Sequence, residues 1–356
     1  MTRSDAARVP LDQVAADQRP LIEAFRAAGE VSFQDVESIA DSRANYEKSC
    51  AANGLAPDAV ARVEDVDLGE FRVRVYDPRP AAEGPSPVIV FAHGGGWVIG
   101  SLETHDRVCR RLAVRTGLPI VAIDYRLGPE HRFPAGHDDS RDAVAWVRDQ
   151  ADARGWDPQR IVTVGDSAGG GIATALAHEP SMRVDGTKVV AQVLLYPVVD
   201  ISQESAGYER ISAGFPLTAD SMRWFAANYL DDPSSASDPR LSPLAALRAA
   251  ESAGVAASAA DATAASAGAG ETDATEASVD EQPGAQPPAW ILALGLDPLG
   301  DEAVNYAAAL TRTGTHVELV YLPHHAHGIF TSAGKIGTGE RMLDQAAAFI
   351  LRQLAQ

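Results

Sequence analysis

Val164-Gly165-Asp166-Ser167-Ala168-Gly169 is the stretch of this sequence that decides its fold. It follows an apolar run typical of a buried strand, and it leads into an alanine-rich segment typical of a helix. A strand, a sharp G-x-S-x-G turn and a helix, in that order, present a serine hydroxyl above the carboxyl edge of a sheet. The sequence therefore predicts that Ser167 is a nucleophile and that the amide of Ala168, which opens the helix, faces developing negative charge. The alternative interpretation is a glycine-rich turn with an incidental serine.

Short apolar runs alternate with helical stretches on both sides of this turn. Strands are expected at 63–68, 71–76, 88–91, 120–123, 161–164, 189–195, 290–294 and 317–322. Helices are expected at about 104–116, 138–153, 168–178, 301–313 and 339–354. This alternation predicts an α/β fold with a mostly parallel, eight-stranded sheet flanked by helices, in which the first pair of strands is antiparallel.

A second motif, His93-Gly94-Gly95-Gly96-Trp97, directly follows the strand expected at 88–91. Successive glycines leave backbone amides uncovered, so that a developing oxyanion can approach them closely. Gly94, Gly95 and Gly96, together with Ala168, are therefore the candidate donors of an oxyanion hole. In isolation the same string would also fit a flexible loop.

Together the two motifs resemble the hormone-sensitive-lipase-like branch of the α/β-hydrolases, a family of many bacterial carboxylesterases. The resemblance extends from about residue 70 to the C-terminus, apart from an acidic insert. Further matching strings are Asp124-Tyr125-Arg126-Leu127, Pro129-Glu130-His131, Phe133-Pro134-Ala135 and Leu241-Ser242-Pro243-Leu244. The resemblance implies an α/β-hydrolase fold with a helical cap over the serine.

The acid and the base of a catalytic triad are expected after Ser167, in the order Asp and then His. Asp297 follows the apolar run at 290–294 and matches the acid position of the resembling family. For the base, His327 matches the family's His-Gly pattern, and its neighbours His324 and His325 are the alternatives. Asp297 would orient the imidazole, and the histidine would move the proton of the serine to the leaving alcohol.

The resemblance also divides the chain into regions. Residues 1–55 are expected to form an N-terminal helical cap segment, and 56–356 the hydrolase domain. That domain contains a cap insertion at about 201–232 and an acidic insert, rich in Ala, Ser and Gly, at about 249–288. The insert has almost no side chains that could bury surface, so we expect it to be disordered.

Large apolar side chains near the motifs are candidates for substrate binding. Trp97 and Val98 lie beside the glycine loop, and Phe215 and Trp224 lie in the cap insertion. All four are expected to line an acyl or alcohol pocket. Packing between the cap and the core is an equally good interpretation of each of them.

Composition limits the partners of this chain. Its 30 Lys and Arg residues against 49 Asp and Glu give a formal net charge of −19, which disfavours binding to nucleic acid or to anionic lipid. Cys50 and Cys109 are expected to be free thiols in a reducing compartment, and a single disulfide between them is the alternative. No signal peptide and no membrane-spanning stretch is recognised, so we expect a cytoplasmic protein without stable membrane association. No metal-ligand spacing and no cofactor motif is found, and a homodimer is left open.

Hydrolysis of small, short- to medium-chain carboxylic esters through an acyl-serine intermediate is the function that the resemblance implies. Hydrolysis of amides or removal of acetyl groups by the same triad is the nearest alternative. A ligand-binding receptor on this scaffold is a different class of protein, and the presence of all three triad residues argues against it.

Overall fold

The eight-stranded sheet that the sequence predicts is present in the computed structural model of the chain, which describes residues 8–80, 84–253 and 285–356. The strand order is β1-β2-β4-β3-β5-β6-β7-β8. β2 runs antiparallel to both of its neighbours, and every pair from β4 to β8 is parallel. The strands are β1 Arg62–Asp67, β2 Arg72–Asp77, β3 Ser86–Ala92, β4 Ile120–Asp124, β5 Trp156–Asp166, β6 Val189–Leu195, β7 Ala289–Leu296 and β8 Val317–Ala326.

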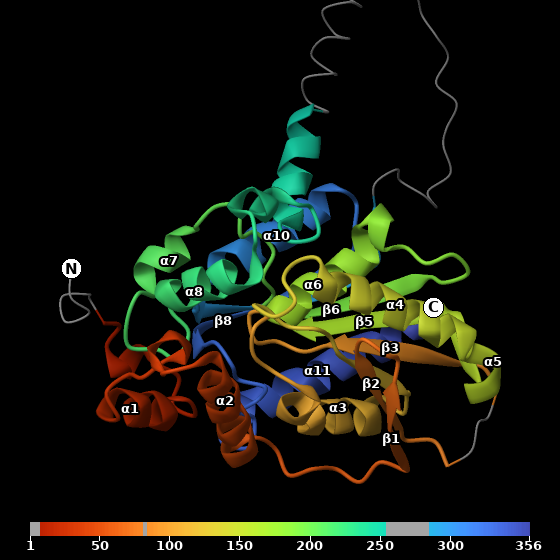
Figure 1. Ribbon diagram of the computed structural model, residues 1–356, viewed down its shortest axis with the longest axis horizontal. Helices are drawn as coiled ribbons and strands as arrows, with labels where there is room; N and C mark the ends of the chain where they lie inside the picture. Colours follow the sequence, from red (N-terminus) through yellow and green to blue (C-terminus); the bar gives the residue numbers. More distant parts are fainter. Residues whose placement is uncertain (1–7, 81–83, 254–284) are drawn as a thin grey trace, which may run out of the picture.

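Helices cover both faces of this sheet (Figure 1). α3 and α11 lie together on one face, and α4, α6 and α10 lie on the other. The helices of these two layers are α3 Leu102–Thr116, α4 Ala135–Asp149, α5 Ala151–Arg154, α6 Ala168–His178, α10 Gly300–Arg312 and α11 Gly337–Leu354. This arrangement is the three-layer architecture that strand–helix alternation predicts.

Alternate residues of one strand enter opposite halves of the core. On β3, Val88 and Val90 belong to the hydrophobic cluster shared with α4 and α6, whereas Ile89 and Phe91 belong to the cluster shared with α3 and α11. Because side chains of a strand alternate between the two faces of a sheet, a strand buried on both faces is apolar at every position. This is why the central strands appear in the sequence as continuous apolar runs.

The cap is built from two parts of the chain that are distant in sequence. α1 Arg19–Ala27 and α2 Ile39–Asn53 lie beside α7 Ala206–Arg210 and α8 Ala219–Tyr229, at the same end of the sheet (Figure 1). The two parts are in direct contact, because the rings of Phe33 and Phe225 lie 5.4 Å apart. Short 3-10 turns complete this region at Leu11–Gln13, Phe33–Asp35 and Pro233–Ser237, and another, Pro180–Met182, follows α6.

The first residues of the predicted acidic insert are helical. Residues 243–253 form a helix, so the first five residues of the predicted insert at 249–288 belong to regular structure. Residues 285–288 lead directly into β7. The rest of the predicted insert, at 254–284, lies outside the described residues.

Buried histidines make the stability of this fold dependent on pH. Burial lowers the pKa of His137 to about 3 and that of His178 to about 4, against 6.5 in an unfolded chain. The unfolded chain therefore binds more protons between about pH 4 and 6.5, and stability falls as the pH decreases through this window. The slope is about 1.4 kcal/mol per pH unit for each such histidine.

Urea unfolding at a series of pH values would measure this slope. We expect His137→Gln to make it shallower and His316→Gln, a change at an exposed side chain, to leave it as it is in the wild type. An equal slope in wild type and His137→Gln would contradict the prediction.

Candidate active site

The predicted nucleophile lies at a strained turn at the end of a strand. Ser167 follows the last residue of β5 and precedes α6, with φ 55° and ψ −123°. A Cβ on Gly165 would come within 2.1 Å of the carbonyl oxygen of Gly169, and one on Gly169 within 2.1 Å of that of Ala92. Only glycine fits at both positions, and the turn therefore requires the G-x-S-x-G pattern for steric reasons.

The predicted acid and base are in contact. His327 Nδ1 lies 2.6 Å from Asp297 Oδ2. Asp297 is fully buried, and its Oδ1 accepts a hydrogen bond of 2.9 Å from the amide of Leu299. The imidazole also packs on Tyr196, with 4.5 Å between ring centres. A buried carboxylate held in this way fixes the tautomer and the orientation of the imidazole.

The structure distinguishes the three candidate histidines. His324 is exposed, and His325 Nε2 lies 3.1 Å from Asp17 Oδ1. His327 is the one that bonds to Asp297, and it lines the cavity that also contains the nucleophile turn. Asp297 directly follows β7 and His327 directly follows β8, so the three proposed triad residues all lie at the carboxyl edge of the sheet.

The glycine loop offers fewer oxyanion donors than the sequence predicts. The amide of Gly94 donates a 2.8 Å hydrogen bond to Asp166 Oδ1 and is therefore occupied. Within the described parts of the chain, no acceptor is found for the amides of Gly95, Gly96 or Ala168. Gly95 and Gly96 line the cavity and have φ values of 125° and 58°. These three amides, without that of Gly94, are the candidate oxyanion hole.

Asp166, the residue before the nucleophile, braces both motifs. Its buried carboxylate lies 3.0 Å from His105 Nε2, in addition to its bond with the Gly94 amide. His105 is oriented by Thr104, whose hydroxyl is 2.8 Å from its Nδ1. Burial would raise the pKa of Asp166, but the charge and hydrogen bond of His105 and the Gly94 amide lower it below the ordinary value. The ionised carboxylate therefore holds the glycine loop against the nucleophile turn.

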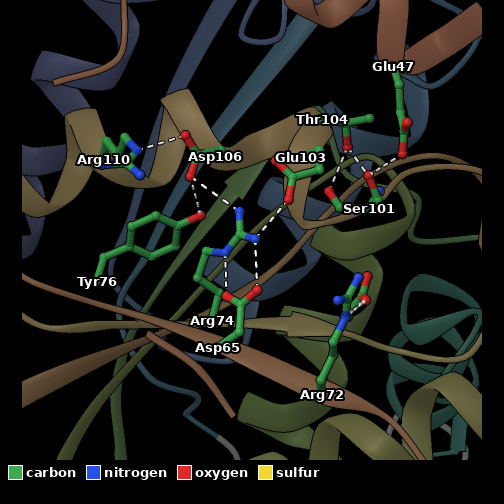
Figure 2. Close-up of polar contacts among 11 residues, drawn as sticks. Glu47, Asp65, Arg72, Arg74, Tyr76, Ser101, Glu103, Thr104, Asp106 and Arg110 are labelled. Carbon is green, nitrogen blue, oxygen red and sulfur yellow. Dashed lines mark hydrogen bonds and ion pairs between the residues drawn. The ribbon is translucent and has the colours of Figure 1, made fainter. Parts of the chain in front are cut away.

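A polar cluster fixes the start of α3, which the short segment 98–101 connects to the glycine loop (Figure 2). Arg74 on β2 contacts Glu103 at 2.7 Å and Asp65 on β1 at 2.6 Å. Ser101, the N-cap of α3, donates a 2.8 Å hydrogen bond to Glu47 of the cap helix α2. The C-terminal end of the glycine loop is thus tied both to the sheet edge and to the cap.

Arg43 is a further support of this loop that sequence reasoning missed. From α2, its guanidinium donates to the carbonyl oxygens of Val98 at 2.8 Å and Gly128 at 2.9 Å. It also forms an ion pair of 2.7 Å with Glu130. No pattern within residues 1–55 indicates this role, because all of its partners are more than fifty positions away.

A cavity of about 410 Å³ lies between the triad and the cap. One wall is apolar and comes mainly from α1 and the cap insertion: Leu21, Ile22, Phe25, Phe33, Leu217 and Phe225. The other wall follows one face of α2, at a spacing of three to four residues, and is polar: Ser42, Asn45, Ser49 and Asn53. The volume is in the range of sites for small ligands.

The four predicted substrate-binding residues are outside the lining of this cavity, which corrects the prediction. Trp97 is 1% exposed and stacks on a tyrosine of the cap, and Val98 is fully buried. Phe215 is buried in the cluster formed with the N-terminal segment. Trp224 packs against Phe225, and it is Phe225 that faces the cavity. The four side chains join the cap and the glycine loop to the core.

Neither cysteine lines this cavity. Cys50 and Cys109 are both free and buried, and burial raises the pKa of Cys50 to about 12. Such thiols are poor nucleophiles. In the described part of the chain, no group of three or more His, Cys, Asp or Glu side chains could hold a metal ion. Nor does any described helix have the length and apolar character needed to cross a membrane.

Comparison with known proteins places this site in a family. A model of the family described as the alpha/beta hydrolase fold matches residues 89–281. Ethyl acetate hydrolase from Pseudomonas putida is 32% identical over 344 residues, which cover 94% of this chain and 96% of that protein. Carboxylesterase NlhH from Mycobacterium tuberculosis is 31% identical over 359 residues, covering 99% of each chain. The chain belongs to the α/β-hydrolase family, in its hormone-sensitive-lipase-like branch.

Solved structures agree with this membership. An ester hydrolase from the metagenome of Lake Arreo, in complex with a derivative of bipyridine phosphonate, has a TM-score of 0.79 and 32% identity, covering 96% of this chain and 100% of that one. An esterase from Pyrobaculum calidifontis has a TM-score of 0.76 and 31% identity, with coverage of 96% and 100%. The similarity therefore includes the cap as well as the sheet.

Proposed function

We propose that this protein is a serine carboxylesterase that hydrolyses small carboxylic esters with short to medium acyl chains through an acyl-serine intermediate. The bond of 2.6 Å between His327 and Asp297, beside the cavity that contains Ser167, is the observation that carries the proposal. The curated relatives named ethyl acetate hydrolase and carboxylesterase support the ester hydrolase class.

The proposed reaction has two halves. Ser167 Oγ attacks the ester carbonyl carbon while His327 takes its proton, and the carbonyl oxygen becomes an oxyanion. The amides of Gly95, Gly96 and Ala168 stabilise this charge. Collapse of the intermediate expels the alcohol, which receives the proton from His327 and leaves an acyl-serine. Water, activated by the same histidine, then attacks the acyl group and releases the acid.

The walls of the cavity support a small substrate. The apolar wall can bury a short hydrocarbon chain, and the polar face of α2 can hydrogen-bond the remainder of the molecule. Phe225 limits the space beside the oxyanion hole, because a Cβ on Gly96 would lie only 2.2 Å from its ring. We expect this wall to disfavour long acyl chains.

Hydrolysis of p-nitrophenyl esters from acetate to palmitate would test this proposal. We expect kcat/KM to be highest at short or middle chain lengths and to fall steeply towards palmitate. Phe225→Ala should shift the optimum to longer or bulkier acyl groups, because it removes a wall of the cavity. Arg223→Ala is the control on the same helix, since its side chain is exposed and outside the lining, and it should keep the wild-type profile.

Two outcomes would contradict the proposal. Folded wild-type protein that hydrolyses none of the esters would exclude simple esters as substrates and would direct the tests to amides and acetylated compounds. A profile unchanged in Phe225→Ala would show that the acyl chain binds elsewhere.

The cytoplasm is the compartment that we propose for this enzyme. The two cysteines are unpaired in the structure, and unpaired thiols persist in reducing compartments. Fractionation of cells that express the untagged protein would test this, and enzyme recovered outside the cytoplasmic fraction would contradict it.

A further inference from the structure

An N-terminal segment, residues 11–18, lies against the end of β8, the strand that leads into His327. The amide of Ala15 donates a 2.8 Å hydrogen bond to the carbonyl oxygen of His324. Two residues further along the strand, the side chain of Gln18 bonds twice to Ala326: Nε2 donates to its carbonyl oxygen at 3.0 Å, and Oε1 accepts from its amide at 2.7 Å. Gln18 is 2% exposed.

These bonds occupy the open side of an edge strand. β8 is the last strand of the sheet, with β7 on one side only. In a strand, residues two positions apart direct their backbone groups to the same side, so His324 and Ala326 share this edge. A carboxamide carries one donor and one acceptor like those of a peptide group, and it can therefore satisfy both groups of Ala326. The N-terminal segment thus takes the place of a neighbouring strand.

Asp17, the residue beside Gln18, bonds to both ends of the loop that connects β8 to α11. Asp17 Oδ1 lies 3.1 Å from His325 Nε2, as described for the candidate histidines. Its Oδ2 accepts hydrogen bonds from the amide and the hydroxyl of Thr338 at 2.9 and 2.7 Å. Thr338 is in the first turn of α11, which follows the loop that begins at His327. Two adjacent side chains therefore hold the loop on both sides of the catalytic base.

We propose that Gln18 is a positioning residue for His327, through which docking of the N-terminal segment sets the geometry of the catalytic base. Gln18 also lines the cavity, so the same side chain closes the substrate site and fixes the backbone next to the imidazole. With the bonds of Gln18 lost, Ala326 keeps its contacts with β7 alone, and the 2.6 Å bond of His327 to Asp297 is no longer held in place.

The test compares Gln18→Met with Gln13→Met, and its kinetic part rests on the proposed esterase function. Methionine has nearly the shape of glutamine but makes neither bond to Ala326. Gln13 is in the same segment, and its exposed side chain makes no hydrogen bond within the described chain. With p-nitrophenyl butyrate, we expect Gln18→Met to lower kcat about 10- to 100-fold, because small misplacements of a reacting group cost that much. KM should change about twofold or less, and Gln13→Met should match the wild type.

A second readout does not depend on esterase activity. The proton on His327 Nδ1, shared with Asp297 over 2.6 Å, should give a low-field proton resonance in the wild type, identified by its loss in Asp297→Asn. We expect Gln18→Met to broaden or remove this resonance while its circular dichroism remains that of the wild type. If wild-type protein hydrolysed no ester, the proposed function would fail, and the resonance would still test the role of Gln18.

Several results would overturn the proposal. They are a kcat in Gln18→Met equal to that of Gln13→Met, an unchanged resonance, or a loss of activity that matches the fraction of unfolded protein. If Gln18→Met does not fold, Asp17→Asn tests the other half of the arrangement. Asparagine cannot accept from both His325 and Thr338 as the carboxylate does, so kcat should fall with KM retained, and an unchanged kcat would again contradict the proposal.

Discussion

Ser167→Ala should lower kcat for p-nitrophenyl butyrate by roughly ten-thousand- to a million-fold. The hydroxyl is the group that forms the acyl intermediate. Without it, the remaining site can only stabilise the transition state for direct attack of water on the ester. The fold should be unaffected, because alanine keeps the Cβ and the main-chain bonds of the turn are between backbone atoms, such as that from the Ser167 amide to the Leu195 carbonyl at 2.9 Å. A phosphonate ester that labels the wild type should leave this variant unmodified.

Ser332→Ala is the matched control for this experiment. Ser332 lines the same cavity, but it does not follow a strand of the sheet or contact the catalytic acid. We expect its kcat to stay within about twofold of the wild type, because its hydroxyl is not part of the proposed triad and removing it should not change the attack on the ester. Retention of more than about a hundredth of wild-type activity in pure Ser167→Ala would mean that another group attacks the ester.

The three proposed triad residues could be placed near one another from sequence because each follows a strand that the local sequence indicates. Ser167, Asp297 and His327 directly follow β5, β7 and β8, and each of these strands is a short apolar run that can be recognised without a structure. Parallel strands end at one edge of the sheet, so finding the strands brings the three residues together. The glycine loop after β3 follows the same rule.

Contacts between distant segments could not be predicted in this way. Gln18 and Ala326 are 308 positions apart, and a single glutamine in a short polar stretch has no periodicity that would mark it. Arg43 is a similar case, since its ion pair is with a residue 87 positions away. Such bonds depend on how the cap docks on the sheet, and that docking is a property of the tertiary structure.

The wrong prediction that Trp224 lines the cavity has a related cause. Trp224 and Phe225 are neighbours on α8, and successive residues on a helix point about 100° apart. The two side chains therefore point in different directions, which are set by the rotation of α8 about its axis, and of the two it is Phe225 that lines the cavity. The sequence marks both aromatic residues equally as candidates. The structure distinguishes them, because the ring of Phe225 packs against Gly96 and lines the cavity.

Asp297→Asn should lower kcat about ten-thousand-fold while the fold is retained. The side-chain oxygen of asparagine can still accept from the amide of Leu299, at the site of the present 2.9 Å bond. Its amide group would then face His327 Nδ1 as a donor, and this nitrogen would have to act as an acceptor. The proton of the neutral imidazole would move to Nε2, on the side of the serine, and the histidine could no longer act as a base.

The control for this variant is Asp301→Asn, in the first turn of α10. Asp301 is partly exposed and pairs with Arg210 at 2.8 Å. An exposed ion pair contributes little to stability, so removing the charge of Asp301 should leave kcat within about twofold of the wild type. Equal activity in Asp297→Asn and Asp301→Asn would contradict the assignment of Asp297 as the triad acid. If Asp297→Asn loses its activity but unfolds in urea like the wild type, the effect is on the tautomer of His327. A buried acid that acts only in folding would change the unfolding curve instead.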